Sequence, residues 1–174
     1  MKLKRYYKLI IAADGSAASG KTTGARLVSK KYNLQFLSSG LLYRYASYHL
    51  IKHKPKNIIS FLKKRFNNLS LKKLNNRLLH SPEISAHSSL IAKDQKIRDV
   101  LKHFQKKFAK KFNKVCIEGR DIGTVILPKA DIKFFFKCNL DIAAQRRFKE
   151  LKKTNKRITF LEVKKAMRIR DNLD

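Results

Sequence analysis

The chain has 174 residues, enough for one α/β domain with its own core, and 43% of them are hydrophobic, which excludes a disordered protein. It carries 42 Lys and Arg against 12 Asp and Glu, a formal net charge of +30. Such an excess is typical of nucleic-acid or membrane-surface binders, but these lysines spread along the whole chain without forming a stripe, which favours a compositional origin. No apolar run reaches the length of a membrane span, so we expect a soluble, cytoplasmic protein.

The first half of the chain begins with a continuous apolar run, typical of a strand buried on both faces of a parallel sheet. Pro55 interrupts the pattern that follows, and the Lys- and Asn-rich segment 54–80 is interpreted as an excursion whose structure the pattern leaves open. The elements expected here are a strand at 8–13, a Gly-rich turn, a helix to about Lys31, a strand at 35–37 and a helix over about 40–53.

The second half carries several helix-start signals. Ser81 and Pro82 suit an N-cap and a first helical residue, and Thr159 with Glu162 matches a capping box. The further elements expected are a long helix to about Phe112, broken near Asp94, strands at 115–118 and 132–136, a helix from Asn139 through Lys153 and a last helix to about Arg170. Strands that alternate with helices predict a parallel sheet of right-handed βαβ units.

Residues 15–22, Gly-Ser-Ala-Ala-Ser-Gly-Lys-Thr, match G-x-x-x-x-G-K-[ST] at every fixed position, between a strand and a helix. Small residues let the backbone N–H groups surround a phosphate, and the helix N-terminus adds positive charge. Lys21 can bridge the β- and γ-phosphates, and the Thr22 hydroxyl can hold Mg²⁺. A Gly/Ser turn that matches by chance is the alternative, but the context favours ATP or GTP binding. The predicted ATP-binding residues are Gly15, Ser16, Ala17, Ala18, Ser19, Gly20, Lys21, Thr22 and Thr23.

Three stretches, at 11–23, 38–44 and 118–124, resemble the signature stretches of bacterial cytidylate kinases and occur in that family's order. The resemblance covers nearly the whole chain except residues 54–80, and Glu-Gly-Arg-Asp-Ile-Gly-Thr at 118–124 is its most specific part. It implies a P-loop NTPase three-layer sandwich, a parallel sheet flanked by helices, with an NMP-binding excursion and a short lid. It also implies an enzyme that uses ATP and Mg²⁺ to phosphorylate CMP and dCMP to CDP and dCDP.

The residue chemistry of the acceptor side agrees with this resemblance. A monophosphate brings a second dianion beside the triphosphate, which calls for bidentate cationic donors. Arg44 and Arg120 each follow a Gly-containing turn near a strand end, where open parallel sheets bind ligands, and Asp121 can accept the cytosine amine proton. Solvated surface side chains are the alternative. The resemblance implies this CMP-binding set: Ser39, Arg44, Ser89, Arg98, Arg120, Asp121, Arg170 and Asp174.

The catalytic set implied by the resemblance is Lys21, Arg120 and three lid arginines, Arg146, Arg147 and Arg157. A cation over the transferring phosphoryl group stabilises its spread negative charge, and the sequence leaves open which lid arginine does so. We expect one kinase domain over 1–174, with its core at 1–53 and 81–174, the excursion at about 54–80 and the lid at about 146–158.

Three features depart from the family. Ser38 stands where the family usually has Asp, segment 54–80 is shorter than usual, and a final strand and helix are expected after Asp174 but are absent from the chain. Another P-loop small-molecule kinase, a nucleotide-binding remnant without turnover and a basic nucleic-acid-binding protein remain alternatives. The expected partners are ATP, CMP and dCMP, with no specific nucleic acid and no membrane, and the expected state is a monomer.

Overall fold

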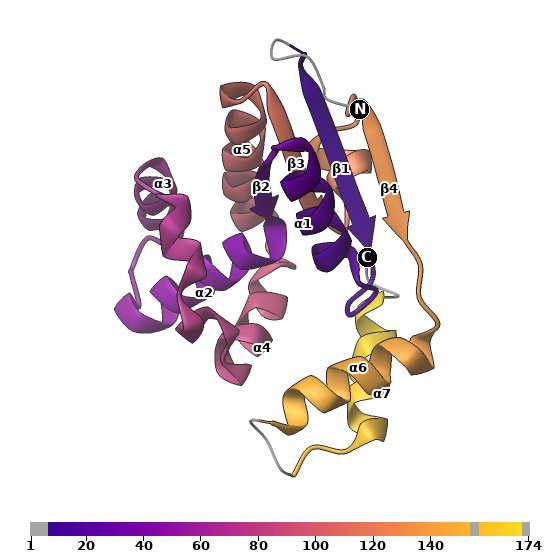
Figure 1. The fold of residues 1–174 in the computed structure, drawn as a ribbon. Coiled ribbons are helices and arrows are strands. Elements are labelled where there is room, and N and C mark those ends of the chain that lie inside the picture. The colour runs from indigo at the N-terminus through magenta and orange to yellow at the C-terminus, as the bar shows by residue number, and fades with distance from the viewer. Residues whose placement is uncertain (1–6, 154–156, 172–174) are drawn as a thin grey trace. The chain divides into compact units, whose positions relative to one another are not determined.

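A computed structural model describes residues 7–153 and 157–171, shown in Figure 1. The chain divides into two compact units. The first, Met1–Leu37 with Asn113–Asp174, contains the sheet and is called here the sheet unit. The second, Ser38–Phe112, is built from helices and is called the helical unit. The helical unit includes segment 54–80 together with helices on both sides of it.

The sheet consists of β1 (Leu9–Gly15), β2 (Gln35–Ser38), β3 (Lys114–Gly119) and β4 (Ile132–Phe136), in the order β2-β3-β1-β4. β1 runs parallel to β3 on one side and to β4 on the other, as Figure 1 shows. The last five residues of β1 are buried, as expected for a central strand covered on both faces. The parallel sheet flanked by helices confirms the α/β prediction.

The two faces of β1 meet different elements, because successive side chains of a strand alternate. On one face, Ile11 and Ala13 share a buried cluster with Ala25 of α1 (Lys21–Tyr32). The other face, which carries Ala12, lies against η3 (Ile122–Ile126), a π-helical turn after β3: a Cβ added at Gly123 would lie 3.4 Å from the Ala12 Cβ. The sequence analysis did not anticipate this turn.

Two helices, α6 (Leu140–Lys152) and α7 (Phe160–Asp171), pack on each other near the end of the sheet unit. The Thr159 N–H donates to Glu162 Oε2 at 2.8 Å and the Glu162 N–H donates to Thr159 Oγ1 at 3.3 Å, which confirms the predicted capping box. The bonds from Thr159 lower the pKa of the Glu162 carboxyl. The helix pair shares a small core to which Ala17 and Ala18 of the phosphate loop also belong as partly buried members.

Segment 54–80, whose structure the sequence left open, folds into three short helices. They are α3 (Ile58–Asn67) and two 3-10 helices, η1 (Leu71–Asn75) and η2 (Arg77–His80). In α3, Leu62 is fully buried, and the Phe66 ring lies between those of Tyr45 and Phe104, at centroid distances of 5.7 and 5.4 Å. Tyr45 belongs to α2 (Ser39–His53) and Phe104 to α5 (Gln95–Lys111), so the segment is held by the helical unit's own core.

The helix break predicted near Asp94 is confirmed. The long helical stretch forms α4 (Pro82–Ile91) and α5, and the Asp94 side chain caps α5 by accepting from the Lys96 and Ile97 N–H groups at 2.8 and 3.1 Å. Ser81 caps α4 through its bond from the Ile84 N–H at 3.2 Å. Among residues 7–153 and 157–171, no helix is long and apolar enough to cross a membrane.

Candidate active site

The phosphate loop leaves β1 at Gly15 and enters α1 at Lys21. Gly15 and Gly20 have positive φ angles of 153° and 91°. A Cβ added at Gly15 would lie 2.5 Å from the carbonyl oxygen of Phe136, so the close approach of β4 requires glycine there. Ala18 also has a left-handed φ of 56°, at some conformational cost for an L-residue. The loop therefore follows a backbone path that most side chains would not permit.

The polar groups of this loop suit a bound anion. The Lys21 Nζ donates to the carbonyl oxygen of Ser16 at 2.9 Å, so the ammonium group lies over the loop. Ser19 is buried, and its Oγ is one of the buried side-chain atoms in the described chain that lack a hydrogen-bond partner. A buried hydroxyl without a partner is costly unless a ligand satisfies it. Together with the N-terminus of α1, these groups fit the phosphates of a nucleotide.

The oxygen donors near the loop also fit Mg²⁺. Thr22 lies exposed in the first turn of α1. Within the described residues there is no cluster of three or more His, Cys, Asp or Glu side chains that could hold a metal ion. In P-loop proteins Mg²⁺ does not need such a cluster, because it is held by the loop's Ser or Thr hydroxyl, a further Asp, the nucleotide phosphates and water. Thr22 is the residue of this chain that would supply the hydroxyl.

Arg120 and Asp121 follow the end of β3, beside the phosphate loop. β3 ends at Gly119, which pairs with Asp14 at the end of β1, directly before Gly15. Parallel strands present their carboxyl ends at one edge of the sheet, so the loop and the Arg120–Asp121 turn lie at the same edge. The Asp121 carbonyl accepts from two N–H groups of η3, which turns the chain immediately after these residues.

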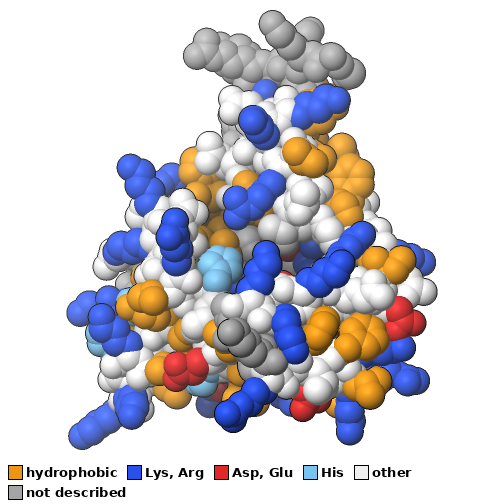
Figure 2. All heavy atoms as spheres, turned by 60° about the horizontal axis from the view of Figure 1, so that its bottom comes forward, with side chains coloured by type: hydrophobic (Ala, Val, Ile, Leu, Met, Phe, Trp, Pro, Cys, Tyr) orange, Lys and Arg blue, Asp and Glu red, His pale blue; other side chains and the backbone are white. Residues whose placement is uncertain are grey.

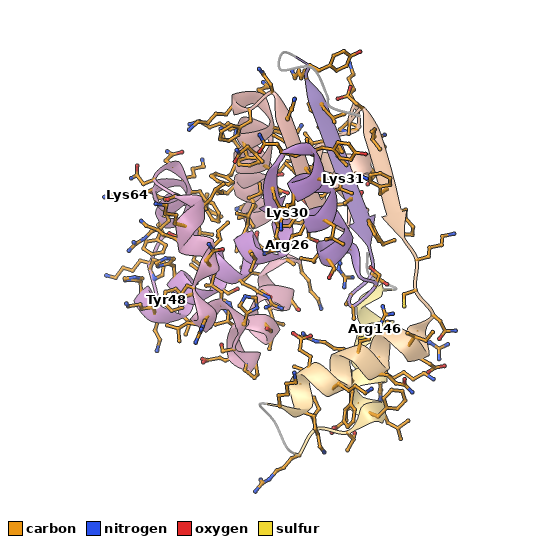
Figure 3. The ribbon with its side chains drawn as sticks, in the orientation of Figure 1. Arg26, Lys30, Lys31, Tyr48, Lys64 and Arg146 are labelled. Carbon is orange, nitrogen blue, oxygen red and sulfur yellow. The ribbon has the colours of Figure 1, made fainter. Side chains whose placement is uncertain are left out.

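The three predicted lid arginines have different surroundings. The Arg146 guanidinium on α6 reaches the phosphate loop, with Nη1 at 3.5 Å from the carbonyl oxygen of Ala18, and Figure 3 labels this residue on α6. The Arg147 Nη1 instead forms an ion pair with Glu150 at 2.7 Å. Arg157 is exposed before α7. Residues 154–156 of the predicted lid lie outside the described residues.

In the helical unit, Ser39 and Arg44 lie on α2. Ser39 is buried in the first turn, and Ser38 caps the helix by accepting from the Leu41 N–H at 3.3 Å. The Arg44 Nη1 lies 3.0 Å from His80 Nδ1 and 3.5 Å from the carbonyl oxygen of Leu79. Arg44 is therefore held against η2, and this positioning by His80 had no signal in the sequence.

Ser89 and Arg98 both lie near the junction of α4 and α5. The Ser89 Oγ donates to the carbonyl oxygen of Ser85 one turn earlier, at 3.2 Å. The Arg98 Nη1 donates to the carbonyl oxygen of Ala92, three residues beyond Ser89, at 3.3 Å. The side chains of the last two predicted CMP-binding residues, Arg170 and Asp174, lie outside the described part of the chain.

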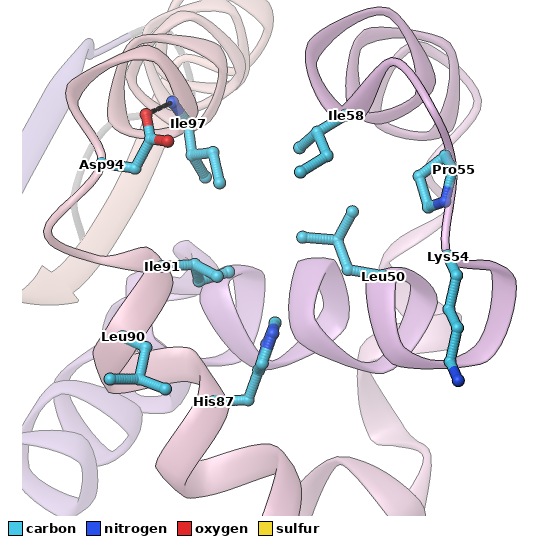
Figure 4. A pocket seen from close by; sticks show the side chains of 9 residues that line it. All are labelled: Leu50, Lys54, Pro55, Ile58, His87, Leu90, Ile91, Asp94 and Ile97. Atoms are coloured by element: carbon cyan, nitrogen blue, oxygen red, sulfur yellow. Dashed lines mark hydrogen bonds between the residues drawn. The ribbon is translucent and has the colours of Figure 1, made fainter.

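A hollow of about 490 Å³ opens in the helical unit, and Figure 4 shows its lining. Most of its lining residues are apolar, and Asp94 is occupied by its bond from the Ile97 N–H. None of the predicted CMP-binding residues lines it. It is therefore a gap between α2, α3, α4 and α5 and not the predicted acceptor site.

On the face drawn in Figure 2, the described basic side chains do not gather into one patch. Figure 2 shows Lys and Arg scattered over the face that it draws, with uncharged surface between them. Several lie over aromatic rings instead of beside acids: the Arg26 guanidinium carbon is 4.9 Å from the centre of the Phe36 ring. The scatter supports the compositional interpretation of the charge.

Burial, with nearby Arg65, His53, Lys52 and Lys73, lowers the pKa of His49 to about 4.

Sequence reasoning missed Asp14. It is buried, and its Oδ1 and Oδ2 accept from the N–H groups of Ile122 and Gly123 at 2.8 and 2.7 Å. An acid at the end of an otherwise apolar strand was the available signal, since buried carboxylates need hydrogen-bond partners. The sequence could not show that the partners lie in η3.

Comparisons with known proteins find similar chains over nearly the whole sequence. A family model described as cytidylate kinase matches residues 11–174. Cytidylate kinases of Bartonella tribocorum and Clostridium tetani are 38% and 33% identical, over 95% and 96% of this chain and 77% and 78% of their own lengths. The fold is similar to a solved structure of an uncharacterized protein from Eubacterium ventriosum, with a TM-score of 0.52 and 15% identity over 95% of this chain and 75% of that one.

Proposed function

The chain belongs to the cytidylate kinase family, and on that premise we propose that it transfers the γ-phosphoryl group of ATP to CMP and dCMP, forming ADP and CDP or dCDP. The observation that carries the proposal is the edge of the sheet at which two strands end. β1 leads into the phosphate loop, and the neighbouring β3 leads into Arg120 and Asp121. A donor phosphate and an acceptor phosphate bound there would lie side by side, as phosphoryl transfer requires.

On the donor side, the main-chain amides of residues 15–22 and the Lys21 ammonium group hold the β- and γ-phosphates. The unpartnered Ser19 hydroxyl supports this role, since a phosphate oxygen would satisfy it. Thr22 is the residue that would hold Mg²⁺, which on binding neutralises part of the phosphate charge. The protein's own contribution is to fix the γ-phosphorus in position.

On the acceptor side, Arg44 and Arg120 grip the CMP phosphate, with Ser39 nearby. Two guanidinium groups match the geometry of a dianionic phosphate better than ammonium groups do. Asp121, Ser89 and Arg98 face the cytosine edge in this proposal, and Arg170 and Asp174 hold the ribose. The bond from Arg98 to the Ala92 carbonyl holds the Arg98 side chain at the junction of α4 and α5, the helices that carry Ser89 and Arg98.

In the transfer step, an oxygen of the CMP phosphate attacks the γ-phosphorus. The bond from that phosphorus to the β–γ bridging oxygen breaks, and ADP leaves with the electron pair. No general base is needed, because the attacking phosphate oxygen is already a nucleophile. Charge grows on the leaving oxygens and spreads over the transferred group, where Arg146 is the best-placed lid arginine. Closure of the lid at about 146–158 excludes water and prevents idle hydrolysis of ATP.

The proposal includes a cytoplasmic monomer whose partners are small nucleotides. The scatter of basic side chains over the face in Figure 2 supports weak, salt-sensitive attraction to polyanions. The proposal includes no dedicated nucleic-acid site. The alternatives are distinguished by binding. ATP binding without transfer to any monophosphate would indicate a remnant, and steeply salt-dependent DNA binding that displaces nucleotide would indicate a nucleic-acid-binding protein.

A coupled ADP-release assay with a panel of monophosphates tests the proposal. CMP and dCMP are expected to be the preferred acceptors, and Arg120→Ala is expected to lower kcat/KM for CMP by about 100-fold or more. Arg26→Ala is the matched control. Arg26 lies on α1, over the Phe36 ring of β2, and its replacement should leave the rate unchanged. Preference for AMP, UMP or a sugar acceptor would refute the assignment.

A further inference from the structure

Asp14 is a buried carboxylate that the proposed mechanism does not use. Only 6% of its surface is exposed, and its position at the end of β1 directly precedes the phosphate loop. Its two oxygens are divided between two backbone donors: Oδ1 accepts from Ile122 N at 2.8 Å, and Oδ2 accepts from Gly123 N at 2.7 Å. Charge-assisted bonds of this length are among the stronger hydrogen bonds of a protein.

These two bonds supply partners for the first two backbone N–H groups of η3. The first N–H groups of a helical turn have no partner within the turn, and a cap normally comes from the residue just before it. Here the preceding residue is Asp121, whose side chain does not cap the turn. The cap comes instead from Asp14, which is 108 residues away in sequence from Ile122. A single carboxylate thus joins the end of β1 to the turn that follows Arg120 and Asp121.

On η3, the residue that meets the Asp14 carboxylate is a glycine, Gly123. A Cβ added at Gly123 would lie 3.2 Å from Asp14 Oδ2, 3.2 Å from Lys133 Cδ and 3.4 Å from Ala12 Cβ. Contacts this short are tighter than ordinary packing, so these neighbours or η3 would have to give way by a few tenths of an ångström. Glycine at 123 therefore lets the backbone approach the carboxylate closely enough for both hydrogen bonds.

We propose that Asp14 is a positioning residue that holds the Arg120–Asp121 turn in register with the phosphate loop. This inference rests on the proposed function, because it assumes that the loop binds the donor and that the turn binds the acceptor. The two elements leave neighbouring strands at Asp14 and Gly119, which are paired across the sheet. A shift of η3 would move the acceptor relative to the γ-phosphorus without disturbing the phosphate loop itself.

Asp131 supplies a control for carboxylate-to-amide bonds at the other end of β1. Its Oδ2 accepts from Ile10 N at 2.7 Å, at the start of β1 and remote from the phosphate loop. Asp131 is exposed and accepts this one backbone bond, whereas Asp14 is buried and accepts two. Asp131→Asn therefore tests whether loss of a carboxylate-to-amide bond in this sheet is by itself enough to lower the rate.

The experiment compares Asp14→Asn with Asp131→Asn in the full chain. Steady-state rates are expressed per active enzyme, and amide hydrogen exchange is measured without nucleotide. In Asp14→Asn, exchange at Ile122 and Gly123 should rise by about 10-fold or more. The value of kcat/KM for CMP should fall by about 10- to 100-fold, while the KM for ATP changes little. Asp131→Asn should match the unaltered chain in amide exchange at Ile122 and Gly123, in kcat/KM for CMP and in the KM for ATP. Gly123→Ala, which disturbs the contact from its other side, should repeat the kinetic pattern of Asp14→Asn.

Two results would overturn the inference. Unchanged exchange at Ile122 and Gly123 in Asp14→Asn would show that the carboxylate does not hold η3. Faster exchange with normal kcat/KM for CMP would show that holding η3 does not matter to the acceptor. Failure of the proposed function gives a different result, because the unaltered chain would then prefer another monophosphate. The comparison of Asp14→Asn with Asp131→Asn is then made with that acceptor. A chain with no turnover on any acceptor would overturn both.

Discussion

Replacing Arg146 by Ala is the perturbation that most directly tests how the lid helix acts. Arg146 is exposed on α6, and its Nη1 lies 3.5 Å from the Ala18 carbonyl oxygen in the phosphate loop. If Arg146 supplies positive charge to the transferring phosphoryl group, kcat should fall by about 10³-fold or more, with a smaller change in the KM for ATP. Arg146→Lys keeps the charge without the planar fork, so it should lose less.

The magnitude separates this role from a structural one. A loss of about 10³ corresponds to about 4 kcal/mol of transition-state free energy. A long hydrogen bond from an exposed arginine to a backbone carbonyl contributes no more than about 1 kcal/mol to folding. Loss of that contact alone would therefore change the rate by less than about tenfold. A larger effect must come from charge that develops during transfer.

Arg147→Ala is the matched control, because Arg147 is the next residue on the same helix and is paired with Glu150. An exposed ion pair is worth about 0–1 kcal/mol, so kcat should stay within about fivefold of the unaltered value. Both variants are measured by stopped-flow or quenched single-turnover transfer to CMP, with urea unfolding to confirm that they fold. A normal rate in Arg146→Ala, with a large loss in Arg147→Ala, would refute the reasoning.

Three other predictions concern the fold. Leu62→Ala should cost about 2–5 kcal/mol in urea unfolding, because Leu62 is fully buried, while Ile58→Ala on the exposed side of α3 should cost little. The pKa of His49 is lowered from 6.5 to about 4, so the unfolded chain takes up a proton at this residue before the folded chain does. The free energy of unfolding should therefore be full above pH 6.5 and fall as the pH drops toward 4. His49→Phe should flatten that fall in unfolding curves at about pH 7 and about pH 5. Gly24→Ala should lower the melting temperature, since its Cβ would lie 2.5 Å from the Phe136 ring, and a smaller residue at 136 should restore it.

Several parts of this protein follow from the sequence alone, because their physics is local. A continuous apolar run predicted the central strand, and the loop before Lys21 was identified from the spacing of its glycines. Caps act within about four residues, so Ser81 and the Thr159–Glu162 pair marked helix starts that the structure confirms. The family resemblance, confirmed by the comparisons, then supplied the substrates that local patterns could not.

Segment 54–80 lay beyond local reasoning. What orders it is the burial of Leu62 and the packing of the Phe66 ring against rings from α2 and α5. Contacts of this kind depend on residues tens of positions away. Propensity is a weak guide where the tertiary core decides the structure.

The tertiary structure alone decided which polar side chains meet. The sequence offered three candidates for the lid arginine, two of them adjacent, and only the packing of α6 against the phosphate loop separates Arg146 from Arg147. It offered no partner for Asp14, because a hydrogen bond across 108 residues leaves no periodic trace in the chain. Local sequence determines where strands, loops and helices begin. Which groups then share an edge of the sheet depends on strand order and register, and these are properties of the folded chain.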